Sequence, residues 1–138
     1  MINKKFYCQF CGKEIVGLHR THKKYCDNQC QADSRYKEFI RRWLIGEISG
    51  ESSGGRTSRH IRRYLMENHN DICSKCGWSE KNPVTGSVPL TVNHMDGNVK
   101  NNVLDNLELI CPNCHSLTPN YGNLNKGKGR ESLGIKRR

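Results

Sequence analysis

Two stretches of the chain place their apolar residues at helical spacing. In the first stretch, apolar side chains recur at intervals of three and four positions: Tyr36, Phe39, Ile40, Trp43 and Leu44. Such spacing predicts a helix with one apolar face. Basic side chains occupy the other face of this predicted helix: Arg35, Lys37, Arg41 and Arg42.

The second stretch is shorter and follows a segment rich in Gly and Ser. Ile61, Tyr64 and Leu65 share one side of a predicted helix, and Thr57 or Ser58 could cap its first turn. The preceding residues 46–55 read GEISGESSGG, a composition that is typical of a flexible joint.

Beyond residue 85 the apolar pattern changes from helical to alternating. Residues 88–92 alternate enough to predict a strand, and Leu107–Ile110 form a second apolar run. Pro112 stands where it could occupy the first turn of a helix. We therefore expect a hairpin with a long polar loop, followed by a helix, in a small α+β fold.

The same patterns divide the chain into four parts. We expect a cysteine-rich module in residues 1–34, two basic helices with a joint near 46–56 in residues 35–72, a second cysteine-bracketed module in residues 73–121, and a basic tail in residues 122–138. The tail lacks apolar periodicity, so we expect much of it to be loosely ordered without a partner.

Composition excludes several classes of protein. Only 34% of the 138 residues are hydrophobic, and no apolar run approaches the roughly 20 residues of a membrane span. The first ten residues contain no apolar core of a secretion signal, so a cytoplasmic location is expected. Eight cysteines in a reducing compartment favour metal binding over disulfides. A membrane enzyme, a secreted disulfide scaffold and a coiled coil are therefore poor interpretations.

The net charge of +10 is unevenly distributed. Residues 1–34 carry +3, residues 35–63 carry +5 and residues 121–138 carry +5, whereas residues 64–120 carry −3. A chain this basic is expected to meet a polyanion. The distribution suggests flanks that hold the anion and a centre with another task.

The later four cysteines form two C-x-x-C pairs: Cys73, Cys76, Cys111 and Cys114. Each pair can place two thiolates at a tight turn, and two pairs complete a tetrahedral site that suits zinc. Four thiolates leave no open coordination position, so this zinc is expected to be structural and to replace part of the core. The alternative, two redox dithiols, lacks its usual βαβ context.

The earlier four cysteines have a looser spacing: Cys8, Cys11, Cys26 and Cys30. The longer final gap fits Cys30 in the first turn of the following helix. A second structural zinc is the preferred interpretation. His19 and His22 lie between the pairs and could replace a thiol, but a solvent or phosphate contact is the preferred role for each.

Four polar and cysteine-containing segments lie between and within the later cysteine pairs: Val92–Asn98, Asn101–Asn102, Asp105–Ile110 and Cys111–His115. Together with the first of these C-x-x-C pairs, they make residues 73–121 resemble the HNH endonucleases, particularly the cysteine-flanked versions of phages and mobile introns. The resemblance covers a little over a third of the chain and implies the ββα-metal fold.

The resemblance implies a role for each matching residue. His94 corresponds to the general base that activates the attacking water, a task that suits neutral imidazole. Asn106 corresponds to the residue whose amide braces the loop that holds this histidine. His115 corresponds to a ligand of a catalytic Mg²⁺ or Mn²⁺ ion, and Asn93 occupies the position of the other protein ligand. The implied products are a 5′-phosphate and a 3′-hydroxyl.

One departure from the family concerns Asn93, where many members have Asp or His. A neutral amide oxygen holds the ion more weakly, which favours dependence on millimolar metal. Some members have a further ligand four residues after the metal-binding histidine, but Pro119 occupies that position here.

Other polar residues near the motif have structural interpretations. Asp96 and Asn98 are expected to shape the turn at Gly97, with contact to metal-bound water as the alternative. His60 and His69 lie on or beside the second basic helix, where phosphate contacts or helix-end roles are expected before catalysis.

The basic flanks are expected to contact DNA phosphates, which position the protein without specifying a sequence. The candidate contacts are Arg56, Arg59, Arg62, Arg63, Lys126, Lys128, Arg130, Lys136, Arg137 and Arg138. The first cysteine cluster resembles small zinc-finger modules of phage proteins, and tethering such a module can raise affinity.

The combined prediction is a metal-dependent HNH endonuclease that hydrolyses DNA, most simply a phage-encoded homing or nicking enzyme on double-stranded DNA. One motif per chain cuts one strand, so a double-strand break would need a homodimer or two nicks. The alternatives are a non-catalytic DNA-binding protein on the same scaffold and a nuclease for RNA or branched DNA.

Overall fold

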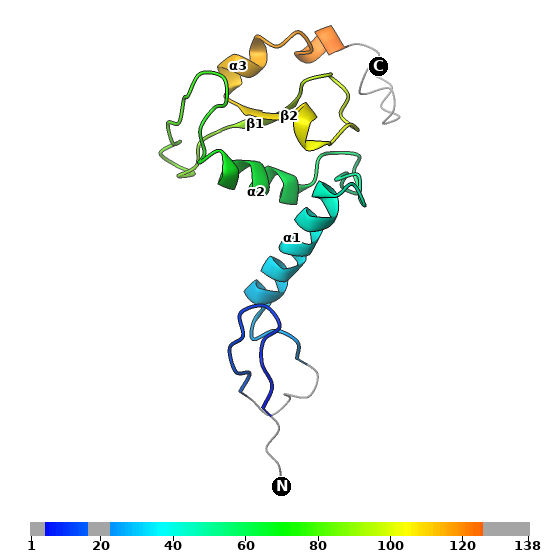
Figure 1. The fold of residues 1–138 in the computed structure, drawn as a ribbon. Helices are drawn as coiled ribbons and strands as arrows, with labels where there is room; N and C mark the ends of the chain where they lie inside the picture. Colours follow the sequence, from blue (N-terminus) through cyan, green and yellow to red (C-terminus); the bar gives the residue numbers. More distant parts are fainter. Residues whose placement is uncertain (1–4, 17–22, 126–138) are drawn as a thin grey trace. The chain divides into compact units, whose positions relative to one another are not determined.

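A computed structural model describes residues 5–16 and 23–125 of the chain (Figure 1). The chain divides into two compact units, residues 1–41 and residues 42–138. His19, His22 and the predicted phosphate contacts of the basic tail lie outside the described residues.

The first unit contains a turn between Cys8 and Gly12 and most of helix α1, which spans Asn28–Leu44. The N–H of Gly12 donates to the carbonyl of Cys8, and Gly12 has a φ of +73°, which favours glycine. Cys30 lies in the first turn of α1, as its spacing predicted. Asp27 Oδ1 accepts from the N–H of Cys30 at 2.7 Å, as a capping side chain does, and this bond is the main reason that the pKa of Asp27 is lowered.

In the second unit, the segment that follows α1 leads to helix α2, Arg59–Asn68. Ser58 is the capping residue, because its side chain accepts from the N–H of His60. The ring of Trp43 meets that of Tyr64 edge-on, with 5.7 Å between the centroids. Gly50 is buried against Trp43 and Ile61, and a Cβ there would collide with both side chains. Part of the expected joint is therefore packed closely against its neighbours.

A two-stranded antiparallel sheet forms the centre of this unit. Strand β1, Thr91–His94, pairs with strand β2, Leu107–Ile110. The second strand has the predicted bounds, but the first begins at Thr91 rather than at Val88. Pro89 has no N–H to donate, and the N–H of Leu90 turns back to the carbonyl of Val88 at 2.8 Å. The alternation at Val88 and Leu90 therefore reflects their burial, and strand pairing begins only at Thr91.

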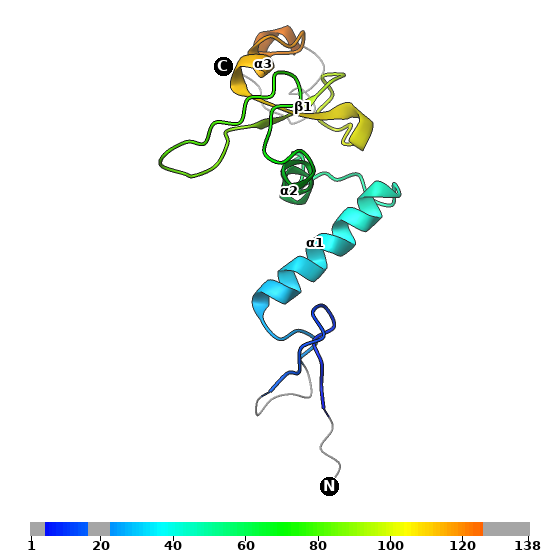
Figure 2. The ribbon, with the colours of Figure 1, turned by 60° about the vertical axis from the view of Figure 1, so that its left-hand side comes forward.

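Helices cover both faces of the sheet. Helix α2 lies on one face and helix α3, Pro112–Ser116, on the other (Figures 1 and 2). The most completely buried large side chains come from α2, from β2 and from the turn that begins at Cys73: Ile61, Leu65, Leu109, Ile110 and Cys73. The small α+β fold predicted from the sequence is confirmed.

Short 3₁₀ helices flank the strand β2 and helix α3. Helix η2, Leu104–Asn106, leads into β2, and helix η3, Gly122–Asn125, follows α3. Pro112 begins α3, as predicted, and the sulfur of Cys111 accepts from the N–H of Cys114 at the start of the helix. None of the helices in residues 5–16 and 23–125 is long and apolar enough to cross a membrane.

Candidate active site and cysteine clusters

The four later cysteines converge from two turns. The Sγ atoms of Cys73, Cys76, Cys111 and Cys114 all lie within 4.8 Å of one another. The sulfur atoms of Cys76 and Cys111 are 3.7 Å apart. Tetrahedral zinc with bonds of 2.3 Å separates its sulfur ligands by about 3.8 Å. The donor set and its spacing therefore fit a zinc ion.

Backbone N–H groups point at the sulfur of Cys73. Burial alone raises the pKa of this thiol, but donation from Cys111, Cys76 and Lys75 outweighs burial and lowers the pKa to about 6. The Cys111 N–H lies 3.3 Å from this sulfur. By contrast, hydrogen bonding to Cys76 and burial raise the pKa of Cys114 to about 12. A thiolate at Cys73 is therefore favoured and one at Cys114 is disfavoured, and a divalent cation bound to both sulfur atoms would offset that cost.

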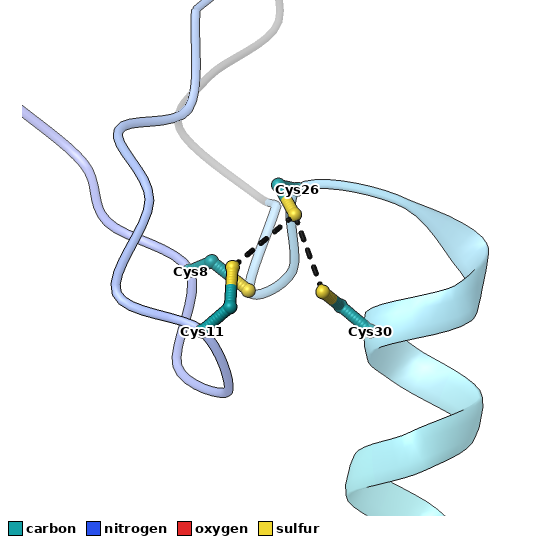
Figure 3. Close-up of side chains that lie close together, drawn as sticks. All are labelled: Cys8, Cys11, Cys26 and Cys30. Atoms are coloured by element: carbon teal, nitrogen blue, oxygen red, sulfur yellow. Dashed lines mark hydrogen bonds between the residues drawn. The ribbon is translucent and has the colours of Figure 1, made fainter.

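The N-terminal cysteines form a second cluster of the same kind. Cys8 and Cys11 come from one turn, Cys26 precedes α1, and Cys30 lies on its first turn (Figure 3). Their Sγ atoms also lie within 4.8 Å of one another, with 3.6 Å between Cys11 and Cys26 and 3.4 Å between Cys26 and Cys30. Within each predicted set, the four cysteines thus lie close together, and each set could hold a zinc ion.

His94 ends strand β1 and makes two side-chain contacts. Its Nε2 lies 2.9 Å from Oδ1 of Asn102 and 3.3 Å from Oγ1 of Thr57. An amide oxygen only accepts hydrogen bonds, so Nε2 carries the proton in this arrangement. The lone pair of the neutral ring is then on Nδ1, which is the atom able to take a proton.

Asn106 ties both ends of the loop between the strands. Its Oδ1 accepts from the N–H of Asp96 at 3.0 Å, and its Nδ2 donates to Oδ1 of Asp96 at 2.9 Å and to the carbonyl of Asn101 at 2.8 Å. Its backbone carbonyl accepts from the N–H of Met95. The segment directly after His94 is therefore fixed by Asn106.

The carboxylate of Asp96 accepts hydrogen bonds from other residues of this loop. A hydrogen bond from the side chain of Asn101 is the largest reason that the pKa of Asp96 is lowered, and the N–H of Asn98 adds to the effect. Asn98 donates to Oδ1 of Asp96 at 2.8 Å, and the N–H of Gly97 donates to the carbonyl of His94 at 3.0 Å. These bonds form the turn at Gly97 that the sequence predicted.

Asn93 lies opposite Glu108 in the sheet register. Its Nδ2 donates to Oε1 of Glu108 at 2.7 Å, and the same carboxylate oxygen lies 3.2 Å from Nζ of Lys75. The bond uses the nitrogen of the Asn93 amide and leaves the carbonyl oxygen, the atom that binds hard cations, for another partner. Asn93 is only 7% exposed.

His115 lies on α3 next to Cys114, as the sequence predicted. Its half-buried ring meets Tyr121 edge-on at 5.2 Å between centroids. The segment after α3 also supports the loop beyond His94, because Nδ2 of Asn120 donates to the carbonyl of Met95 and Nδ2 of Asn125 donates to that of Gly97.

Comparison with known proteins assigns this region. The family model of the HNH endonucleases matches residues 73–119. The chain contains an HNH domain. The H-N-H endonuclease F-TflIV of Escherichia phage T5 is 45% identical to the chain over 62 residues, which are 43% of this chain and 25% of the phage protein. The chain therefore spans about a quarter of the length of this relative. No solved structure matches the chain.

The predicted catalytic residues and the later cysteines lie within the HNH domain, but one residue that contacts His94 does not. Thr57 precedes the domain by sixteen positions, and the sequence suggested only a capping role for it. Asn102 was among the residues that carry the family resemblance, but the sequence suggested no role for it. The alternation of strand β1 and the cap at α2 are local signals, whereas the contact between Thr57 and His94 joins residues 37 positions apart.

The predicted phosphate contacts within the described residues lie on or before α2. Arg56, Arg59, Arg62 and Arg63 are exposed, and Arg63 also pairs with Glu67 at 2.7 Å. Burial and the neighbouring cations Arg63 and Arg59 lower the pKa of His60. His69 is the C-terminal capping residue of α2, the helix-end role expected for it.

Proposed function

We propose that the protein is a metal-dependent endonuclease that hydrolyses phosphodiester bonds in double-stranded DNA. The observation that carries this proposal is the arrangement around His94 in the HNH domain. The ring is held through Nε2, and Nδ1 is left with its lone pair. Such a histidine can accept the proton of a water molecule as that water attacks phosphorus.

His115 and Asn93 are the proposed ligands of the catalytic cation. Amide oxygen is a suitable donor for hard cations such as Mg²⁺ and Mn²⁺, whereas imidazole nitrogen is more typical of transition metals. A divalent cation bound there would neutralise charge on the phosphate and on the leaving oxygen. Asn106 is proposed to keep the loop after His94 in one conformation, so that the ring is already oriented when substrate binds.

The cysteine clusters are proposed to hold structural zinc ions with separate tasks. The cluster at Cys73 would join the start of the HNH domain to the end of β2. A backbone hydrogen bond links the same two segments, since the N–H of Ser74 donates to the carbonyl of Leu109. The N-terminal cluster organises a separate unit, which we propose adds DNA contacts outside the cleavage site. The arginines of α2 are proposed to hold the phosphate backbone.

A nicking assay tests the proposal. Zinc-loaded protein is incubated with supercoiled plasmid and with Mg²⁺ or Mn²⁺, and open-circular and linear products are followed over time. We expect wild-type protein to convert the plasmid first to open circles, because one HNH domain cuts one strand. His94→Ala should lower the cutting rate by about 10²–10⁴-fold, the usual contribution of a general base, with DNA affinity nearly unchanged.

The matched control is His69→Ala, which removes an exposed histidine at the end of α2 and should leave cutting intact. Retained cutting by His94→Ala would refute the assigned mechanism. Tight DNA binding without nicking in any metal would instead favour a non-catalytic DNA-binding protein. Parallel duplex, junction and RNA substrates show which nucleic acid is cut.

A further inference from the structure

The hydroxyl of Thr57 has no role in capping helix α2. Ser58 occupies the capping position, and its own hydroxyl accepts from the N–H of His60 at 3.2 Å. Thr57 instead lies with its Oγ1 2.8 Å from Oδ1 of Asn102 and 3.3 Å from Nε2 of His94. The three side chains therefore form a closed triangle of polar contacts.

The donors and acceptors of this triangle are mutually consistent. Thr57 donates its single hydroxyl proton to Oδ1 of Asn102. The N–H at Nε2 of His94 faces the same amide oxygen and the lone pairs of the Thr57 hydroxyl. Each contact is satisfied only if the proton of the neutral ring is on Nε2.

Asn102 is fixed at both its side chain and its backbone. It is 2% exposed, and its carbonyl accepts from Nε1 of the buried Trp43 at 2.7 Å. Its Nδ2 is buried without a hydrogen-bond partner among the described residues. The side chain of Asn102 is therefore held through its oxygen, which has two partners, and its backbone is held through the carbonyl.

We propose that Thr57 and Asn102 are positioning residues for His94, which hold the ring with its proton on Nε2 and leave Nδ1 as the proton acceptor. This inference rests on the proposed role of His94 as general base. Thr57 lies before residues 73–119, so the catalytic unit includes the segment that enters α2. A base held in one tautomer and one orientation is ready for proton transfer in every encounter with substrate.

Cleavage kinetics test the role of the Thr57 hydroxyl. Thr57→Val keeps the shape of the side chain and removes the hydroxyl, and it should lower the single-turnover cutting rate by about 5–10-fold, the value of one neutral hydrogen bond. The DNA concentration at half-maximal rate should not change. Thr57→Ser should restore the rate to within about twofold. Thr85→Val makes the same change at an exposed turn and is the control.

A double mutant shows whether Thr57 acts through His94. In the His94→Ala background, Thr57→Val should change the residual rate by less than about twofold, because effects on one chemical group do not add. A further 5–10-fold loss in that background would overturn the inference. The inference would also be overturned if Thr57→Val cut DNA at the wild-type rate, or if Thr57→Ser cut it as slowly as Thr57→Val.

Nitrogen-15 NMR of histidine-labelled, zinc-loaded protein reads the tautomer directly. The His94 signals are assigned by their loss in His94→Ala, and spectra are recorded at a pH where the ring is neutral. We expect the wild-type ring to carry its proton on Nε2, and Asn102→Ala to give a mixture of tautomers. A proton on Nδ1 in the wild type would overturn the inference.

The two proposals fail in distinguishable ways. If wild-type protein cuts no nucleic acid in any metal, the proposed function fails, and the NMR spectra still decide whether the two side chains set the tautomer. If His94 is essential for cutting but Thr57→Val is as fast as wild type, the positioning role alone is wrong.

Discussion

The loop that follows His94 depends on one buried amide, and its removal has a calculable cost. Asn106 is 8% exposed and makes three side-chain hydrogen bonds, two to Asp96 and one to the carbonyl of Asn101. Each neutral bond contributes about 1 kcal/mol, and the bond to a carboxylate somewhat more. Asn106→Ala should therefore lower the free energy of unfolding by about 2–4 kcal/mol.

The measurement is urea unfolding of zinc-loaded protein at a fixed free zinc concentration, since bound metal adds to apparent stability. With a slope of about 1.5 kcal/mol per molar urea for a unit of this size, the midpoint should fall by about 1.3–2.7 M. Asn106→Asp keeps the size of the side chain but sets a second carboxylate beside that of Asp96, so it should also be strongly destabilising.

The control is Asn113→Ala on the exposed side of α3, which should change stability by less than about 0.5 kcal/mol. At temperatures where all variants are folded, Asn106→Ala should also cut DNA more slowly and bind it with wild-type affinity. A loss of stability below 0.5 kcal/mol in Asn106→Ala, or wild-type stability in Asn106→Asp, would show that these hydrogen bonds do not hold the loop.

Three further predictions concern the same unit and the cysteine clusters. Gly97→Ala places a Cβ at a φ of +75° and within 2.6 Å of a side-chain oxygen from η3, so thermal unfolding should show a loss of about 1–2 kcal/mol or more, and wild-type stability would contradict this crowding. The carboxyl carbon of Asp96 should titrate below the usual range of aspartate in NMR, and Asn101→Ala should raise its pKa. The stability from this depressed pKa is present above about pH 4 and is lost as the pH falls through the folded value; an unchanged pKa in the variant would contradict the assigned cause. Metal analysis should find two zinc ions per chain. Cys76→Ser should lose one ion and nuclease activity, whereas Cys11→Ser should lose one ion and retain nicking. Loss of nicking in both variants would contradict separate tasks for the two clusters.

Local signals in the sequence predicted much of the fold. The spacing of apolar residues indicated the face of α1 that buries Tyr36, Ile40 and Trp43, but Leu44 on the same predicted face is exposed. Thr57 or Ser58 was expected to cap α2, and Ser58 does. Pro112 begins α3, as expected. Cysteine spacing predicted two clusters because C-x-x-C turns are local structures. The helix face, the cap and each close cysteine pair depend on neighbours within a few positions, and a single sequence contains that information. The convergence of two distant pairs was inferred from the four ligands that a zinc ion needs.

Features that depend on distant partners were not predictable in the same way. The alternation at Val88 and Leu90 indicated burial correctly but not the start of β1, since a strand also needs a partner with which to pair. The contact of Thr57 with His94 follows from the packing of α2 on the sheet, which no local pattern encodes. The catalytic roles of Asn93, Asn106 and His115 stay predictions until kinetics test them.

Trp43 gives the protein an internal optical probe. The chain has two tryptophans: the indole of Trp43 is bonded to the carbonyl of Asn102, and the carbonyl of Trp78 accepts from the N–H of Cys73. Replacing Trp78 with Phe would leave one fluorophore, bonded to the residue that contacts His94. Its emission would then report rearrangement around the candidate active site in real time, without an attached dye.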